Sequence, residues 1–214
     1  MDYLNFFITS FTTIFVIVDP PGNIPTFLSI TESFGPRIRD TISKKSTIIG
    51  CTILLAFALS GNFLLNFFKI SIDGLRIAGG LLLFAISVDI LMGSRRKEVY
   101  AERKIESSDI DSIAVFPIAL PLYTGPGAIT ATIVLSNEAT NLQMKTIVIL
   151  SILVVYAIVR LTHVYSNFII RILGSSGSNI IARLMAIFLA AIAIEFIFTG
   201  LEGKISLILK NHSL

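Results

Sequence analysis

The chain alternates between long apolar runs and short polar stretches. Six apolar runs can be traced, at about residues 4–31, 46–68, 72–93, 113–136, 144–166 and 180–202. Each is close to the roughly 20 residues that a helix needs to cross a bilayer. The runs lack the alternation of a transmembrane β-strand, and a single segment in lipid satisfies its own backbone only as a helix. The pattern predicts an all-α, polytopic membrane protein with six transmembrane helices.

Composition agrees with this prediction. Of the 214 residues, 54% are hydrophobic and 14% are charged, whereas a soluble domain has about 25% charged residues. We therefore expect the lipid bilayer to be the solvent for much of the chain. The net charge of +3 is small and the basic residues lie between the apolar runs, so no nucleic-acid partner is expected. The single cysteine, Cys51, cannot form an internal disulfide.

Basic residues are concentrated on one side of the six runs. The stretches after the first, third and fifth runs contain Arg37, Arg39, Lys44, Lys45, Arg95, Arg96, Lys97, Arg103, Lys104, Arg171 and Arg183. The other side has Lys69, Arg76, Lys145, Lys204 and Lys210. Because cytoplasmic loops are rich in Lys and Arg, this bias predicts a cell inner-membrane protein with both termini outside.

The two halves of the chain resemble each other. Arg76 in the third run aligns with Arg183 in the sixth at an offset of 107 residues, and Pro21 in the first aligns with Pro126 in the fourth at an offset of 105. Because each unit has an odd number of spans, three, the second copy enters the membrane from the opposite side. Inverted repeats of this kind are typical of secondary transporters. Chance similarity between apolar helices explains the third and sixth runs alone, but less readily a Pro-Gly motif repeated at nearly the same offset.

This repeat divides the chain into three parts. We expect a first three-helix repeat at 1–93, a cytoplasmic linker at 94–112 and a second, inverted repeat at 113–214. The linker is rich in charged residues, and it is either a solvated connection or a docking site for a partner.

Proline and glycine clusters interrupt the first and fourth runs. The first contains the sequence DPPGNIP at 19–25, and the fourth contains Pro117, Pro121 and the sequence GPG at 125–127. Proline removes a backbone donor and clashes with the preceding helical turn, so neither run can stay a regular helix. We expect both helices to be broken at mid-membrane. Two simple kinks that only shape the bundle are the alternative interpretation.

A broken helix exposes backbone groups that bind ions. The new helix N-terminus suits a carboxylate, and the freed carbonyls suit a cation. We expect Asn23 to cap the second half of the first span, and Thr124 to do the same in the fourth. The predicted substrate or ion site contains Asp19, Pro21, Gly22, Asn23, Thr124, Gly125, Gly127 and Glu195.

Acidic residues inside the apolar runs give the sharpest functional hypotheses. A carboxylate at the bilayer centre costs at least about 2.5 kcal/mol, so Asp19 needs a role. It binds Na⁺, carries a proton, receives a substrate ammonium or caps amides beside the prolines. For Glu195 a coupling ion, a proton relay and a buried hydrogen bond all stay open, whereas Asp89 is expected at the interface. Arg76, Arg160 and Arg183 are expected to anchor span ends.

No motif of a soluble enzyme is present. The sequence has no HExxH motif, no P-loop and no glycine-rich nucleotide motif. His163 and His212 lie near a span end and in the tail, far in sequence from an obvious nucleophile. We therefore expect no enzymatic activity and no cofactor beyond a coupling Na⁺ or H⁺.

Three motifs resemble a known family. The sequences DPPGNIP at 19–25, PLYTGPGAI at 121–129 and LRIAGG at 75–80 are similar to those of the MarC family of membrane proteins, also called the neutral amino acid transporter family. The resemblance extends over nearly the whole chain. It implies six spans in an inverted three-plus-three arrangement, and cation-coupled transport of small neutral amino acids such as alanine or glycine.

Two main functional hypotheses follow, beside a third, an intramembrane hydrolase, which would require two carboxylates close together in a shared cavity. In the first, the protein is a secondary transporter that binds a small solute between the two broken helices. In the second, it is a non-transporting membrane protein that assembles with or regulates a partner through the linker at 94–112. The sequence leaves the oligomeric state open.

Overall fold

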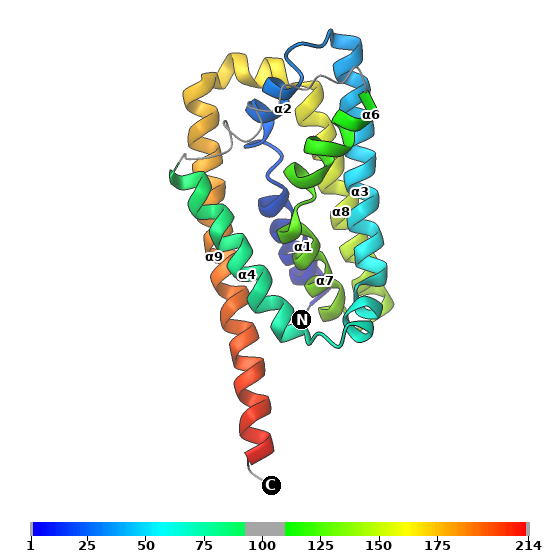
Figure 1. Cartoon of the computed structure of the whole chain (residues 1–214), viewed down its shortest axis with the longest axis vertical. Helices are drawn as coiled ribbons and strands as arrows, with labels where there is room; N and C mark the ends of the chain where they lie inside the picture. Colours follow the sequence, from blue (N-terminus) through cyan, green and yellow to red (C-terminus); the bar gives the residue numbers. More distant parts are fainter. Residues whose placement is uncertain (1, 93–109, 213–214) are drawn as a thin grey trace.

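The protein is a bundle of helices in the computed structural model, which describes residues 2–92 and 110–212 (Figure 1). Each regular element in these two ranges is helical. The elements are α1 (Tyr3–Val18), α2 (Ile24–Ile30), α3 (Pro36–Phe67), α4 (Ile72–Met92), α6 (Ile110–Ile113), η1 (Ala114–Tyr123), α7 (Pro126–Glu138), α8 (Leu142–Val164) and α9 (Ser166–His212). Each of the six apolar runs predicted from the sequence is therefore helical over most of its length.

Several of these helices are long and apolar enough to cross a membrane. Four qualify alone among the described residues: α3, α4, α8 and the Ser176–Lys210 part of α9. A fifth span arises if Ile110–Tyr123 and Pro126–Glu138, which are bent by 61°, are taken as one. With 16 residues, α1 is shorter than a full crossing. The fold is thus that of a polytopic helical membrane protein.

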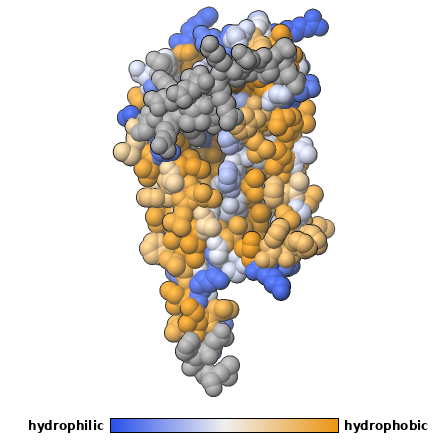
Figure 2. All heavy atoms as spheres, in the orientation of Figure 1, coloured by the Kyte–Doolittle hydropathy of each residue, from blue (hydrophilic) through white to orange (hydrophobic). Residues whose placement is uncertain are grey.

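The outer surface of the bundle has the polarity expected in lipid. Figure 2 shows hydrophobic residues along the sides of the bundle and hydrophilic ones near its ends. Large apolar side chains face outward, among them Leu59, Phe63 and Phe198, which are 74%, 69% and 60% exposed. In water such a surface would drive aggregation, whereas in a bilayer it is in contact with acyl chains.

Two helices extend beyond the apolar runs. α3 begins at Pro36, ten residues before the predicted start at 46, because proline fits the first turn of a helix and the following Arg and Lys residues are good helix formers. α9 begins at Ser166 and changes direction at Gly174, whose φ of 64° is readily adopted only by glycine. Because α3 begins at Pro36, the basic residues at 37–45 lie on a helix and not in a loop.

Contacts show that α1 and α8 run in the same direction. Asn141, just before α8, lies beside Tyr3 at the start of α1, and His163 at the end of α8 stacks on Phe27 in α2. α3 and α7 are also parallel: Gly50 in the middle of α3 lies beside Thr124, just before α7, and Asn62 further along α3 is hydrogen-bonded to Asn137 near the end of α7.

Other neighbouring helices are antiparallel. For α3 and α8, the contacts are Ser43 with His163 and Gly50 with Tyr156. For α4 and α7, they are Arg76 with Glu138 and Leu83 with Gly127. For α4 and α9, they are Asp73 with Gly203 and Gly80 with Ala193. The helices of the six runs thus alternate in direction along the chain.

Small residues let α4 pack closely on its neighbours. A Cβ atom at Gly80 would lie 2.7 Å from the carbonyl oxygen of Ala193 on α9, and one at Gly79 would overlap Thr130 on α7. Ala186 on α9 is fully buried. These contacts show that small residues let α4 lie close to α7 and α9.

The predicted linker at 94–112 falls largely on residues 93–109, which lie outside the described residues. Its last residues belong to the short helix α6, which leads directly into η1. The division of the chain into two repeats and a linker stays a prediction.

Candidate functional site at two broken helices

The first break separates α1 from α2. Helix α1 ends at Val18, Asp19 adopts left-handed backbone angles (φ 49°, ψ 60°), and α2 begins at Ile24. The Oδ1 atom of Asp19 accepts a hydrogen bond of 3.0 Å from the Gly22 amide. A Cβ atom at Gly22 would overlap this carboxylate, so only glycine allows it to stay in place. This hydrogen bond matches one of the roles considered for Asp19, the capping of a freed amide.

Asn23 ties the two halves of the first break together. It is the N-cap residue of α2, as expected, but its side chain makes no capping hydrogen bond there. Instead, its Nδ2 atom donates to the carbonyl oxygen of Val18 at 2.9 Å. The prediction of a side-chain cap was wrong, because the last carbonyl of α1 needs a donor once the helix stops.

The second break lies between η1 and α7. Phe116 and Leu120 have extended backbone angles inside η1, since each precedes a proline, which disfavours helical geometry. Gly125 is the N-cap of α7, which begins with Pro126 in its first turn. A Cβ atom at Gly125 would lie 2.9 Å from the carbonyl oxygen of Pro121, so this close turn needs glycine.

Thr124 ends the first half of the broken segment and does not cap the second. Its backbone N–H donates to the Ala119 carbonyl at 2.9 Å, and its hydroxyl is hydrogen-bonded to that of Tyr156 on α8 at 2.5 Å. The predicted cap was therefore wrong by one residue, because Gly125 occupies that position. The threonine instead fixes the break to α8.

The two breaks are neighbours inside the bundle. A Cβ atom at Gly127, in the first turn of α7, would lie 3.9 Å from a methyl group of Ile17, two residues before Asp19. The same atom would overlap Leu83 of α4. Val16 and Leu83 also share a buried cluster with Ala193 of α9. Residues 110 positions apart in sequence, Ile17 and Gly127, thus meet in one place, covered by α4 and α9.

A buried histidine, His163, contacts both broken segments: α2, which follows the first break, and the end of η1, which precedes the second. His163 on α8 is 4% exposed, and its ring stacks on Phe27 of α2 with a centroid distance of 3.7 Å. Its Nε2 atom is 2.7 Å from the hydroxyl of Tyr123, the residue before Thr124. Its Nδ1 atom is 2.9 Å from the Ser43 hydroxyl on α3. Both ring nitrogens therefore have partners.

This chain of hydrogen bonds continues to the first turns of α3. Arg160 donates to the Ser43 hydroxyl at 2.6 Å and forms an ion pair with Asp40, which also pairs with Lys44 at 2.9 Å. With Arg160 as donor, Ser43 donates to His163 Nδ1, and Nε2–H then donates to Tyr123. Arg160 was expected only to anchor a span end, but it closes a hydrogen-bonded chain that reaches the second break.

Comparison with known proteins identifies the chain. The model of the "MarC family integral membrane protein" matches residues 4–205. The chain belongs to the MarC family. It is 58% identical over 203 residues to a "UPF0056 membrane protein" of Archaeoglobus fulgidus, covering 95% of each chain.

More distant relatives cover the MarC chain equally well. A UPF0056 membrane protein of Methanocaldococcus jannaschii is 40% identical over 202 residues, with 94% of this chain and 98% of the relative covered. The protein YvbG of Bacillus subtilis is 33% identical over 201 residues, with 93% and 95% covered. The names of these relatives describe membrane proteins and give no substrate. No solved structure matches the chain.

In this MarC-family chain seven of the eight predicted site residues fall into two groups. Asp19, Pro21, Gly22 and Asn23 lie at the first break, and Thr124, Gly125 and Gly127 lie at the second. Glu195 is exposed on α9, whereas Ala193, two residues earlier, is buried in the bundle. Because residues two apart on a helix point to different sides, the structure does not bring Glu195 to the breaks.

Sequence reasoning missed His163, Tyr123 and Ser43. A histidine near the end of an apolar run is a weak signal, and its partners are 40 and 120 residues away in sequence. Only the antiparallel packing of α3 and α8 and the break in η1 bring them together. The predicted anchoring of Arg76 is also incomplete, since it pairs with Glu138 at 2.8 Å and with Asp73 at 3.4 Å.

Proposed function

We propose that this MarC-family protein is a secondary transporter of a small polar solute, which binds between the two broken helices. The observation that carries the proposal is the meeting of the breaks at Ile17 and Gly127, one from each half of the chain. Discontinuous helices that meet inside a bundle are the usual substrate and ion sites of secondary transporters.

The alternating directions of the helices support six crossings for the proposed transporter. In that arrangement α1 and α2 together make the first crossing, and η1 and α7 make the fourth. Elements at equivalent positions in the two halves also contact each other: α3 with α8, α4 with α9, and α1 with α7. Because the first two of these pairs are antiparallel, the contacts support an inverted repeat, with one half rocking against the other.

The chemistry of the two breaks favours a zwitterionic solute. The first turn of α7 has backbone amides without helical acceptors, and it is buried at Gly127 and Ala128. These amides suit a carboxylate. Asp19, which is 4% exposed, supplies a negative charge at the neighbouring break for an ammonium group or a coupling Na⁺ or H⁺. A small neutral amino acid has both charges, and it is the substrate class that we propose.

Uptake by purified protein in liposomes tests this proposal. We expect accumulation of labelled alanine, glycine or serine when a Na⁺ or H⁺ gradient is imposed, and none in protein-free liposomes. Asp19→Asn should abolish gradient-dependent accumulation, whereas Asp89→Asn, the same change at an exposed position on α4, should leave it intact. Absence of gradient-dependent uptake for all three solutes would remove the amino-acid assignment. Wild-type uptake by Asp19→Asn would remove Asp19 from the mechanism.

A further inference from the structure

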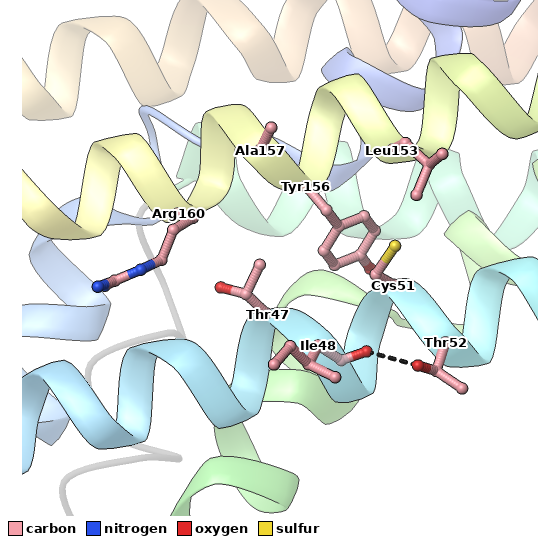
Figure 3. A pocket seen from close by; sticks show the side chains of 8 residues that line it. All are labelled: Thr47, Ile48, Cys51, Thr52, Leu153, Tyr156, Ala157 and Arg160. Carbon is pink, nitrogen blue, oxygen red and sulfur yellow. Dashed lines mark hydrogen bonds between the residues drawn. The ribbon is translucent and has the colours of Figure 1, made fainter.

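A groove runs along the outside of the bundle between α3 and α8. Its volume is about 320 Å³. Figure 3 shows its lining, which consists of Thr47, Ile48, Cys51, Thr52, Leu153, Tyr156, Ala157 and Arg160. Both helices are long and apolar enough to cross a membrane. The groove is therefore open to lipid, and Ile48 and Leu153 on its rims are 65% and 44% exposed.

The part of the groove nearest Leu153 is apolar, although Thr52 and Tyr156 there have hydroxyl groups. The hydroxyl of Tyr156 is hydrogen-bonded to Thr124 inside the bundle, which leaves the aromatic ring as the floor. The hydroxyl of Thr52 donates to the Ile48 carbonyl of its own helix at 2.8 Å, as Figure 3 shows. An acyl chain can therefore lie along the groove without leaving a polar group of either residue unpaired.

One end of the groove is basic. Arg160 lies at this end with its guanidinium directed away from Leu153, and its side chain is 24% exposed. Lys44 is 60% exposed and shares Asp40 with Arg160, so two cations face one carboxylate. The first ten residues of α3 contain four basic side chains and one acidic one. This end of the groove therefore has an excess of positive charge.

Thr47 lies between the basic end and the apolar floor. It is 9% exposed, and its hydroxyl has no hydrogen-bond partner among the described residues. In Figure 3 the hydroxyl oxygen of Thr47 is on the side of Arg160. A buried hydroxyl without a partner costs free energy, and a small shift of the side chain would let it donate to an ester or phosphate oxygen of a ligand.

We propose that this groove binds a phospholipid with an anionic headgroup. Its phosphate lies at Arg160 and Lys44, and part of one acyl chain lies over Tyr156 toward Cys51 and Leu153. The distance along α8 from Arg160 to Leu153 is about 10 Å at 1.5 Å per residue. Basic pockets between transmembrane helices select anionic headgroups. The proposal does not depend on transport, because it rests only on the surface of α3 and α8.

The composition of the chain allows a direct test with site-specific fluorescence. The sequence has no tryptophan, so Leu153→Trp places the single tryptophan of the chain in the groove. Leu59→Trp places one at a 74% exposed position on α3, with no basic residue within nine positions along the chain. Each variant is reconstituted in vesicles that contain phosphatidylglycerol or phosphatidylcholine with brominated acyl chains, at equal mole fractions. Bromine quenches tryptophan only on contact.

We expect brominated phosphatidylglycerol to quench Trp fluorescence in Leu153→Trp with an apparent affinity about five-fold higher than that of brominated phosphatidylcholine. The Leu59→Trp variant should be quenched equally by both lipids. Adding Arg160→Gln to Leu153→Trp should remove the preference. Lys44→Gln, at an exposed position that does not contact Ser43, should reduce the preference for phosphatidylglycerol without disturbing the buried hydrogen bonds of Ser43 and His163.

Three results would overturn the proposal. Equal quenching of the Leu153→Trp variant by both lipids would remove headgroup selectivity. A preference that survives both Arg160→Gln and Lys44→Gln would remove these two residues as the headgroup site. Quenching by neither lipid would show that a solute or a second copy of the chain, rather than lipid, covers the groove.

Discussion

At the scale of single residues, Asp19 has a role that needs no ligand. Its carboxylate accepts the buried Gly22 amide, which the break between α1 and α2 would otherwise leave without an acceptor. A hydrogen bond to a charged group contributes about 1.5–3 kcal/mol. Asp19 therefore stabilises the broken backbone on which a binding site depends, so changing it affects both stability and any transport.

Two substitutions separate these effects. Asp19→Ala removes the acceptor and should lower the free energy of unfolding by about 1–3 kcal/mol. Asp19→Asn keeps an acceptor oxygen for Gly22 and should cost less. Thermal unfolding of the detergent-purified protein measures both. The control Asp89→Ala, at an exposed position, should stay within about 0.5 kcal/mol of wild type. An equal loss in the Asn and Ala variants would point to the charge and not to the hydrogen bond.

The hydrogen bond between Tyr123 and His163 gives a second prediction at this scale. Tyr123→Phe keeps the ring but leaves the Nε2 atom of His163, which is 4% exposed, without its hydroxyl partner. We expect a loss of about 1–3 kcal/mol in the free energy of unfolding. The matched control is Tyr165→Phe, since Tyr165 is 56% exposed. If both variants unfold at the same temperature, the buried pair does not stabilise the fold.

At the scale of elements, two glycines of α9, Gly200 and Gly203, contact α4. One faces backbone atoms of α4 and the other faces a side chain. A Cβ atom at Gly200 would lie 2.7 Å from the backbone carbonyl oxygen of Asp73, whereas one at Gly203 would meet only the Asp73 side chain at 2.5 Å. A side chain can turn away, but the backbone of a helix cannot. The two positions lie in the same helix three residues apart, so they form a matched pair.

We therefore expect Gly200→Ala to destabilise the protein more than Gly203→Ala. The first should cost about 1–3 kcal/mol, the usual effect of overpacking, and the second less than 1 kcal/mol. Thermal unfolding in one detergent compares the two variants directly. The reverse order, or equal losses, would contradict the close packing of α4 on α9.

Much of the helical architecture could be predicted from the sequence. Hydropathy located all six helical runs, and the prolines located both interruptions, because these signals are local. The helix starts were less accurate, since Pro36 and the basic residues after it continue α3 into a stretch that reads as a loop. Asn23 is the predicted N-cap residue of α2, but its side chain bonds to Val18 instead, and Gly125 rather than Thr124 caps α7. These details were missed because the choice among nearby backbone groups depends on how the chain turns. The partners of His163 depend on helix packing, which a single sequence does not contain.

At the scale of the whole molecule, α1 begins at one end of the bundle, and α9 extends past that same end (Figure 1). Tyr3 at the start of α1 contacts Asn141, next to the end of α7. Glu138 in the last turn of α7 pairs with Arg76 near the start of α4, and Gly203 of α9 contacts the same turn of α4. The basic first turns of α3 and the start of α1 thus lie at opposite ends of the bundle, as expected if the end rich in Lys and Arg faces the cytoplasm.

We predict that the end with the basic turns of α3 faces the cytoplasm, so that both termini are outside. In a Cys51→Ser background, which removes the single native thiol, Lys145→Cys should react with a membrane-impermeant maleimide in intact cells. Lys44→Cys should react only after the membrane is opened, although both lysines are exposed. Leu59→Cys on the lipid-facing side of α3 should react in neither case, because a thiol in lipid is rarely ionised. Labelling of Lys44→Cys and not Lys145→Cys in intact cells would reverse the orientation, and labelling of both would contradict their placement at opposite ends of the bundle.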